Sequence, residues 1–524
     1  MLSGRADSGT AATSDPAKAS HSRRQVSIAR STILNLLGAG APLLVALFAI
    51  PVLAGTLGTD RFGVLNLAWV VLGYFGLFDL GLGRAMTKFV AEKVGLGQES
   101  AIPTLVWNSL ALMLVFGFIG SVIALAITPW LVREALKIPP ALQTESLSSF
   151  YLLALSIPVV TSTAGLRGLL EAKQRFDLVN LVRIPHGVFS FLAPMAVLPF
   201  SHSLLPIVAV LLAGQIAGWG VHLLLCFRVV PGLRRYPGLR LSTARPLLRV
   251  GTWMSVSNII SPLMVTLDRF VIGGLISVSA VAYYAVPYQT VTKLWIIPGA
   301  LTAVLFPAFA AAWVRDDERA AGLLRKAVKY TFLLLFPLTL FIVTLGHEGL
   351  RLWLGSEYAE NSTEVLQWLA IGVFLNCLAH IPFALIQAAG RPDVPAKFHL
   401  LELPFYLAAL WSLIRAFGIE GAAIAWTLRC ALDTILLFAS VRRFFRGNPF
   451  SLRRFAIATT LALGTIAAGA LPMEVWTKTV FLGATMSLFM LIGWYRVLTP
   501  DERSRIRGRV EHRKSSLDHT GGLR

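Results

Sequence analysis

Long apolar runs alternate with short polar segments along most of the 524 residues. A run of about 20 apolar residues is long enough to cross the hydrocarbon core of a bilayer as a helix. Runs of this kind predict fourteen membrane-spanning helices, placed at 33–55, 64–83, 101–128, 148–169, 179–200, 204–227, 250–275, 281–308, 328–347, 364–388, 397–417, 419–441, 455–473 and 475–498. Prolines at 287, 298 and 307 predict a bend in the eighth of these helices. The pattern predicts an all-α polytopic membrane protein.

Composition agrees with this class and excludes an ordinary soluble protein. Hydrophobic residues make up 56% of the chain and charged residues 14%, with a mean hydropathy of +0.69. The three cysteines, Cys226, Cys377 and Cys430, fall in apolar segments without paired spacing. We therefore expect them to be small core residues, and we expect neither disulfides nor a metal site.

Basic residues predict the orientation in the membrane. Most of the 47 lysines and arginines lie in the two tails and in every second connection between predicted helices, for example 228–249 and 442–454. Cytoplasmic loops carry such an excess, so both termini are expected in the cytoplasm and the protein in the cytoplasmic (inner) membrane. The asymmetry accounts for most of the net charge of +20. Membrane lipids are therefore the expected anionic partner, and no nucleic acid is needed.

A weak internal repeat predicts two lobes of equal orientation. The stretch that begins NLLGAGAPLL resembles the one that begins SVSNIISPLM, with Pro42 opposite Pro262 and six helices between them. The expected organisation is a disordered basic tail at 1–30, an N-lobe of helices 1–6 at 31–228, a cytoplasmic linker at 229–249, a C-lobe of helices 7–12 at 250–441, helices 13–14 at 442–498 and a basic tail at 499–524.

Charged residues inside the seventh and eighth helices are the first candidates for a site. Asp268 and Arg269 lie in the seventh helix, and Lys293 lies in the eighth with Gln289 on the same face. Lys293 is about 12 residues, or about 18 Å, inside its helix, which is near the bilayer centre. A charge at this depth normally faces a bundle interior or an aqueous cavity. These residues are expected to line a polar, partly cationic cavity; pairing with neighbouring charges is the alternative.

Further polar positions follow helical spacing in the first two helices. Arg24, Arg30 and Asn35 fall on one stripe, Asn66 and Asp79 fall on another, and Arg84 comes at the cytoplasmic end of helix two. They could line the substrate path. Hydrogen bonding between packed helices, or anchoring at the headgroups, is the competing interpretation.

Acidic residues within the spans are candidates for coupling an ion. They are Asp79, Asp268, Glu402 and Asp433, and the histidines at 186, 222, 380 and 399 are further proton acceptors in or near spans. Arg429 lies four residues before Asp433 on the same helix face, which favours a local salt bridge between them.

Motifs of catalysis are missing from the sequence. It contains no phosphate-binding glycine loop, no metal-spaced set of histidines and cysteines and no G-x-S-x-G elbow. We therefore predict that the chain is not an enzyme and has no cofactor or metal. Without an ATP site, energy would come from an ion gradient, membrane potential or consumption of a product outside.

Two stretches carry a resemblance to a known family. They are LGTDRFGVLNLAWVVLGYFGLFDLGLGRAMTKFVAE at 57–92 and LDRFVIGGLISVSAVAYYAVPYQ at 267–289, the latter followed by Phe306–Pro307. The chain resembles the Wzx-type polysaccharide flippases of the multidrug/oligosaccharidyl-lipid/polysaccharide (MOP) exporter superfamily. The resemblance implies a two-lobed, V-shaped, MATE-like bundle whose central cavity alternates between membrane sides. It also implies translocation of a polyprenyl-pyrophosphate-linked oligosaccharide for surface polysaccharide biosynthesis.

In related flippases, arginines of helices one, two, seven and eight engage the pyrophosphate or acidic sugars. This chain has Arg24, Arg30, Arg84, Arg269 and Lys293 in those regions. The resemblance leaves open a coupling ion, H⁺ or Na⁺, and a polysaccharide polymerase as partners.

Two other functions are weighed against flipping. A drug/cation antiporter of the same superfamily would bind cations through intramembrane carboxylates, but helix one contains none. A membrane glycan polymerase or glycosyltransferase would need external loops rich in acids or arginines, and the outer loops here are short.

Overall fold

The computed structural model describes residues 16–74, 82–235, 238, 264–315, 317–444 and 452–504, apart from positions 265 and 501. For residues 16–40 it describes the backbone without the side chains. Residues 1–15 and 505–524 of the predicted tails and most of the predicted seventh span lie outside this part of the chain. Residues 16–30, which were predicted to be disordered, form the start of helix α1 instead. Every regular element in the described residues is a helix, which confirms the predicted all-α class.

The helices follow one another with short connections. Their bounds are α1 Pro16–Tyr74, α2 Leu82–Gly95, α3 Ile102–Trp130, α4 Pro140–Ala172, α5 Phe176–Val197, α6 Leu204–Val229, α8 Val278–Val291, α9 Ile296–Arg315, α10 Asp317–Thr344, α11 Gly346–Leu354, α12 Ser356–Ala388, α13 Asp393–Phe444, α14 Leu452–Gly469 and α15 Val475–Ile492. Residues 266–275 are also helical. Within the described residues, nine helices are long and apolar enough to cross a membrane. The count of fourteen spans stays a prediction.

Two of the longest helices are each two predicted spans joined at a glycine. Gly58 breaks α1 with φ 75°, and Gly418 breaks α13 with φ 63°, a backbone region that favours glycine. Near the second break, a Cβ at Gly421 would lie 1.9 Å from the carbonyl oxygen of Leu413. A side chain cannot fit there, so the tight turn depends on glycine at both 418 and 421.

The predicted bend in the eighth span is a short 3₁₀ segment. Residues Thr292–Trp295 separate α8 from α9. Pro298 lies just after this segment and has no N–H to donate to the carbonyl of residue 294, so regular α-helical bonding fails there. The segment contains Lys293.

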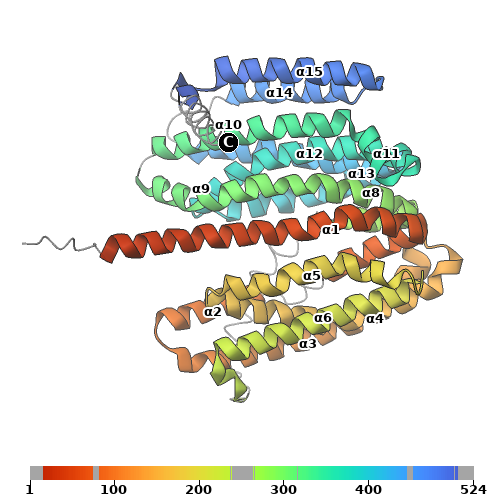
Figure 1. The fold of residues 1–524 in the computed structure, drawn as a ribbon, viewed down its shortest axis with the longest axis vertical. Coiled ribbons are helices and arrows are strands. Elements are labelled where there is room, and N and C mark those ends of the chain that lie inside the picture. Colours follow the sequence, from red (N-terminus) through yellow and green to blue (C-terminus); the bar gives the residue numbers. More distant parts are fainter. Residues whose placement is uncertain are drawn as a thin grey trace, which may run out of the picture. The chain divides into compact units, whose positions relative to one another are not determined.

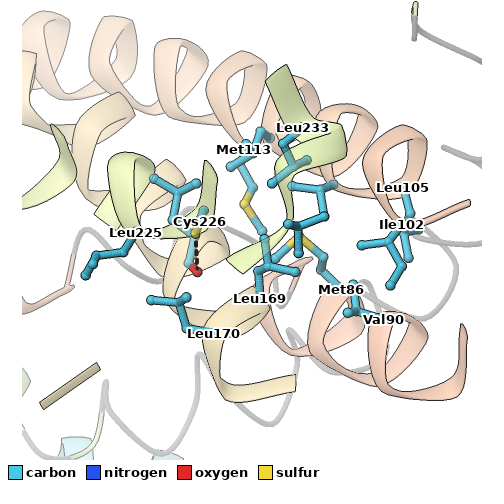
Figure 2. Close-up of a cluster of buried hydrophobic side chains, with 14 of the residues drawn as sticks. Met86, Val90, Ile102, Leu105, Met113, Leu169, Leu170, Leu225, Cys226 and Leu233 are labelled. Atoms are coloured by element: carbon cyan, nitrogen blue, oxygen red, sulfur yellow. Dashed lines mark hydrogen bonds between the residues drawn. The ribbon is translucent and has the colours of Figure 1, made fainter. Parts of the chain in front are cut away.

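The chain divides into two compact units, Met1–Pro262 and Leu263–Arg524. In the first, α4 contacts α2, α3 and α6, while α5 contacts α1 and α6 (Figure 1). Figure 2 shows part of its apolar core, where Met86 and Met113 lie near Leu169 and where the thiol of Cys226 donates to the carbonyl of Leu166 at 3.4 Å. The finer lobe and linker boundaries stay predictions.

Helix α12 is the centre of the second unit. It contacts α8, α9, α10, α11 and α13, and 78% of its most apolar window is buried (Figure 1). The hydroxyls of Thr427 and Thr434 on α13 donate to the carbonyls of Trp368 and Leu375 on α12, at 2.7 and 3.1 Å. Such bonds between helices replace part of the association energy that the hydrophobic effect cannot supply in lipid.

Candidate functional site

Lys293 has an exposed, positively charged side chain, although it directly follows α8, most of whose residues are buried. Its side chain is exposed, and the described residues place no acidic group within 4 Å of its ammonium. Because α8 begins at Val278, Lys293 lies 15 residues along from its start, or about 22 Å. This is deeper than the predicted 18 Å and beyond the middle of a hydrocarbon core about 30 Å thick. Gln289, one turn earlier, is half-buried.

Asn66 does not face an open surface. Its side chain is buried, and its amide donates to the carbonyl of Phe62 at 2.9 Å, one turn earlier on the same helix. This placement favours the packing interpretation over a role in substrate binding. Arg24, Arg30 and Asn35 lie on α1, and Arg84 lies on α2, but their side chains are outside the described part. Asp79 falls wholly outside the described residues.

Asp268 and Arg269 are buried within the second unit rather than open to a cavity surface. Asp268 has no exposed surface and accepts hydrogen bonds from the Tyr284 hydroxyl at 2.6 Å and from the Arg269 backbone N–H at 2.8 Å. The Arg269 guanidinium stacks on the Tyr288 ring, 4.6 Å from its centroid, and is 5% exposed. The predicted cavity-lining role of this pair therefore needs an alternative conformation. The contacts favour the structural-pair interpretation.

Helix α13 brings a second group of charges together. Glu402 is 1% exposed and Asp433 5% exposed, while the His399 side chain keeps 21% of its surface accessible. His399 Nε2 lies 3.9 Å from Asp433 Oδ1, and a ligand atom from each of the three residues lies within 4.8 Å of the others. Both oxygens of Glu402 and Oδ1 of Asp433 lack a hydrogen-bond partner in the described residues. We call these three residues the α13 triad.

The expected salt bridge between Arg429 and Asp433 is wrong. Among the described residues Arg429 forms no ion pair within 4 Å. Its guanidinium instead lies over the rings of Tyr406 and Trp426, at 5.6 and 5.7 Å from their centroids. Aromatic faces attract a desolvated guanidinium, so the two rings offer Arg429 an alternative to a carboxylate partner.

Sequence analysis named each member of the α13 triad as a candidate but did not predict that the three side chains lie together. Glu402 comes sixteen residues before Gly418, and Asp433 comes fifteen residues after it. A turn at Gly418 that folds the two arms side by side therefore sets the two carboxylates at one depth, about 23 Å from the turn. Equal spacing about the glycine is the signal that could have predicted the group.

Two of the other histidines named from the sequence are held by their own helices. In His222 and His380, Nδ1 contacts the carbonyl oxygen of Gly218 and of Asn376, at 2.8 and 2.9 Å. Each partner is one turn earlier on the same helix. These contacts favour a packing role over proton transfer.

Comparisons with known proteins decide the family. A family model described as polysaccharide biosynthesis protein matches residues 28–313, more than half of the chain. A candidate O-antigen transporter of Shigella flexneri is 32% identical over 416 residues, covering 79% of this chain and 97% of the relative. The chain belongs to the polysaccharide biosynthesis protein family.

Another relative and two solved structures of the MOP superfamily are also similar to this chain, the structures in their fold. A candidate flippase of low-salt glycan biosynthesis from Haloferax volcanii is 25% identical and covers 78% of this chain and 82% of the relative. The inward-facing form of a multidrug-resistance MATE transporter has a TM-score of 0.66 at 15% identity, covering 79% of this chain and 98% of that one. A MOP transporter from Pyrococcus furiosus has a TM-score of 0.58 at 16% identity, covering 80% and 95%.

These findings confirm three predictions for this polysaccharide biosynthesis protein. It belongs with the polysaccharide and O-antigen transporters that it resembled in sequence, it has the MATE-like fold, and it is a membrane transporter rather than an enzyme. At 15–16% identity the solved structures support the fold alone.

Proposed function

We propose that this polysaccharide biosynthesis protein flips a polyprenyl-pyrophosphate-linked oligosaccharide across the cytoplasmic membrane by alternating access, with both termini in the cytoplasm. The observation that carries the proposal is Lys293, an exposed ammonium deep in a membrane span with no acidic neighbour within 4 Å in the described residues. A charged side chain at this depth is costly when it faces lipid. The presence of Lys293 therefore favours a position in contact with water and with an anion that enters with the water.

A pyrophosphate suits such a cation. Phosphate oxygens accept strong, charge-assisted hydrogen bonds from an ammonium, and these bonds gain strength where the surroundings have a low dielectric constant. A sugar chain offers hydroxyls to polar neighbours such as Gln289, while the polyprenyl chain stays in lipid. Relatives that carry the names O-antigen transporter and glycan flippase support a sugar-containing substrate.

The experiment measures translocation by the purified full-length protein in liposomes, with a fluorescent polyprenyl-pyrophosphate oligosaccharide. Lys293→Ala should reduce the flipping rate about tenfold or more, because the anion loses its counter-charge. Lys293→Arg should retain part of the rate, because the positive charge remains. Lys326→Ala removes an exposed lysine of α10 and should flip at the wild-type rate.

Three results would contradict the proposal. Equal rates for Lys293→Ala and wild type would remove Lys293 from the substrate path. Transport of drug cations without flipping would instead favour the antiporter. Altered glycan chain length in a deletion strain in which flipping persists would favour a polymerase.

A further inference from the structure

We propose that Arg167, His186 and His222 bind the headgroup of an anionic phospholipid that also carries hydroxyls, of the phosphatidylglycerol type, from the cytoplasmic leaflet. These residues lie on α4, α5 and α6 of the first unit, and we call them the α4–α6 basic group. Lys293 belongs to the second unit, and binding of a lipid here does not rest on the proposed flipping.

Three neighbouring helices bring the group together. Helix α6 packs against both α4 and α5 (Figure 1). Arg167 of α4 and His186 of α5 both act electrostatically on His222 of α6. A Cβ at Gly218 would lie 3.6 Å from Nδ1 of His186, so this imidazole meets the α6 backbone one turn before His222. The basic side chains therefore lie around a single turn of α6.

His222 has one ring nitrogen that no described residue engages. It is 6% exposed, and its Nδ1 lies 2.8 Å from the carbonyl oxygen of Gly218. Because a carbonyl oxygen can only accept, Nδ1 carries the proton, and in the neutral imidazole Nε2 is a hydrogen-bond acceptor. Nε2 is buried and has no partner in the described residues. Buried polar atoms normally have one, so Nε2 calls for a donor from outside the chain, such as a hydroxyl.

Arg167 supplies the charge that attracts a phosphate. Its side chain is exposed and contacts Glu171, one turn later on α4, at 3.6 Å. An exposed pair of this kind contributes little. A guanidinium has five N–H donors, so several remain for phosphate oxygens. A headgroup that combines a phosphate with hydroxyls therefore matches Arg167 and His222 together.

The group lies at the depth of lipid headgroups. Helix α6 has 26 residues and is about 39 Å long, close to the thickness of a bilayer with its headgroups. Arg167 and His222 lie five and seven residues before the ends of α4 and α6, or about 8 and 10 Å from them. This end of the unit also carries Lys173, Arg175 and Arg228 and is predicted to be cytoplasmic. Basic pockets between helices on that side suit anionic headgroups.

The test measures the thermal unfolding midpoint of the purified full-length protein in a neutral detergent while one lipid is titrated in. Phosphatidylglycerol should raise the wild-type midpoint in a saturable manner, because a ligand that binds only the folded state stabilises it. Phosphatidylmethanol has the same charge but no headgroup hydroxyl, so it should need about a tenfold higher concentration for the same shift. Phosphatidylcholine should cause no saturable shift.

Variants separate the two contacts. Arg167→Ala should raise the half-saturating concentration of both anionic lipids about tenfold. His222→Phe should bind phosphatidylglycerol and phosphatidylmethanol equally, because the acceptor for the hydroxyl is gone. Glu171→Gln should instead tighten binding about two- to fivefold, because Arg167 loses its competing carboxylate. Arg228→Ala removes another exposed arginine at this end of α6 and, as the control, should respond like the wild type.

Four outcomes would overturn this assignment. Equal wild-type responses to phosphatidylglycerol and phosphatidylcholine would remove the phosphate contact, and equal responses to phosphatidylglycerol and phosphatidylmethanol would remove the hydroxyl contact. An unchanged response of Arg167→Ala would place binding elsewhere, and this surface variant keeps the test decisive if His222→Phe does not fold. A polyprenyl-pyrophosphate oligosaccharide that abolishes the response to phosphatidylglycerol would assign the group to the transported substrate. Flipping is not measured here, so a failure would leave the role of Lys293 untouched.

Discussion

An aspartate inside a membrane helix depends on the few donors within its reach. Asp268 receives one hydrogen bond from Tyr284 and another from the backbone of Arg269. Tyr283, the neighbour of Tyr284 in sequence, donates instead to the more exposed Glu357. Two adjacent tyrosines therefore hold hydroxyls in very different surroundings.

We expect Tyr284→Phe to destabilise the protein by about 1–3 kcal/mol, because an oxygen of Asp268 would remain buried without a donor. Tyr283→Phe is the control and should cost less than about 1 kcal/mol, because water can replace its hydroxyl at Glu357. Thermal or denaturant unfolding of the purified protein measures both. Equal losses for the two variants would contradict the assignment.

Sequence reasoning located individual charged residues but not their partners. The 16 residues that separate Asp268 from Tyr284 contain the turn between two helices, so the rotation of each helix decides whether they meet. For Arg429, the four-residue spacing on one helix predicted a salt bridge with Asp433, but two aromatic rings compete with that carboxylate for the guanidinium. Which residues meet across two helices depends on how the helices pack. The spacing of residues within one helix does not reveal this packing.

At the scale of elements, Glu502 connects the segment that follows α15 to α10. Lys329 donates to both oxygens of Glu502 at 2.7 Å, and the Tyr330 hydroxyl donates to it as well. The backbone N–H of Thr499 also donates to the Glu502 carboxylate, and the backbone N–H of Glu502 donates to the Thr499 hydroxyl, as in a capping box. Burial alone would raise the pKa of Glu502, but these hydrogen bonds lower it to about 2.

A lowered pKa gives this contact a defined pH dependence. Its stabilisation is fully present above the unfolded pKa of 4.5 and is lost as the pH falls through about 2. We expect Glu502→Gln to cost about 1 kcal/mol at pH 7, since the pair is partly solvated, and progressively less below pH 4.5. Unfolding midpoints from pH 7 down to pH 3 measure the difference. Glu360→Gln, an exposed acid of α12, should remain equal to wild type throughout.

Hydropathy predicted the helical elements well because lipid imposes a length and a composition on each span. It did not predict that Gly58 and Gly418 join neighbouring spans into the continuous elements α1 and α13. The prolines correctly indicated the irregularity before α9, while the 3₁₀ form of residues Thr292–Trp295 depends on local hydrogen bonding. The amphipathic helices α2 and α11 are too short or too polar for the same rule to detect.

At the scale of the whole molecule, the distribution of lysine and arginine gives a testable orientation. The native cysteines are all buried, so a membrane-impermeant maleimide should give little background labelling. In intact spheroplasts, Ala416→Cys, beside the turn at Gly418, should react. Arg235→Cys, in the connection after α6, should react only after permeabilisation. The reverse pattern would contradict the predicted cytoplasmic location of both termini.

The surroundings of α15 determine how freely its sequence can change. Only 6% of its most apolar window is buried by protein, and Lys478 pairs with Glu348 of α11 at 2.8 Å near one end. Lipid chains and aliphatic side chains make almost equivalent neighbours for the remaining surface. Evolution can therefore exchange one large apolar residue for another along most of this helix at little cost, provided that its attachments at the two ends persist.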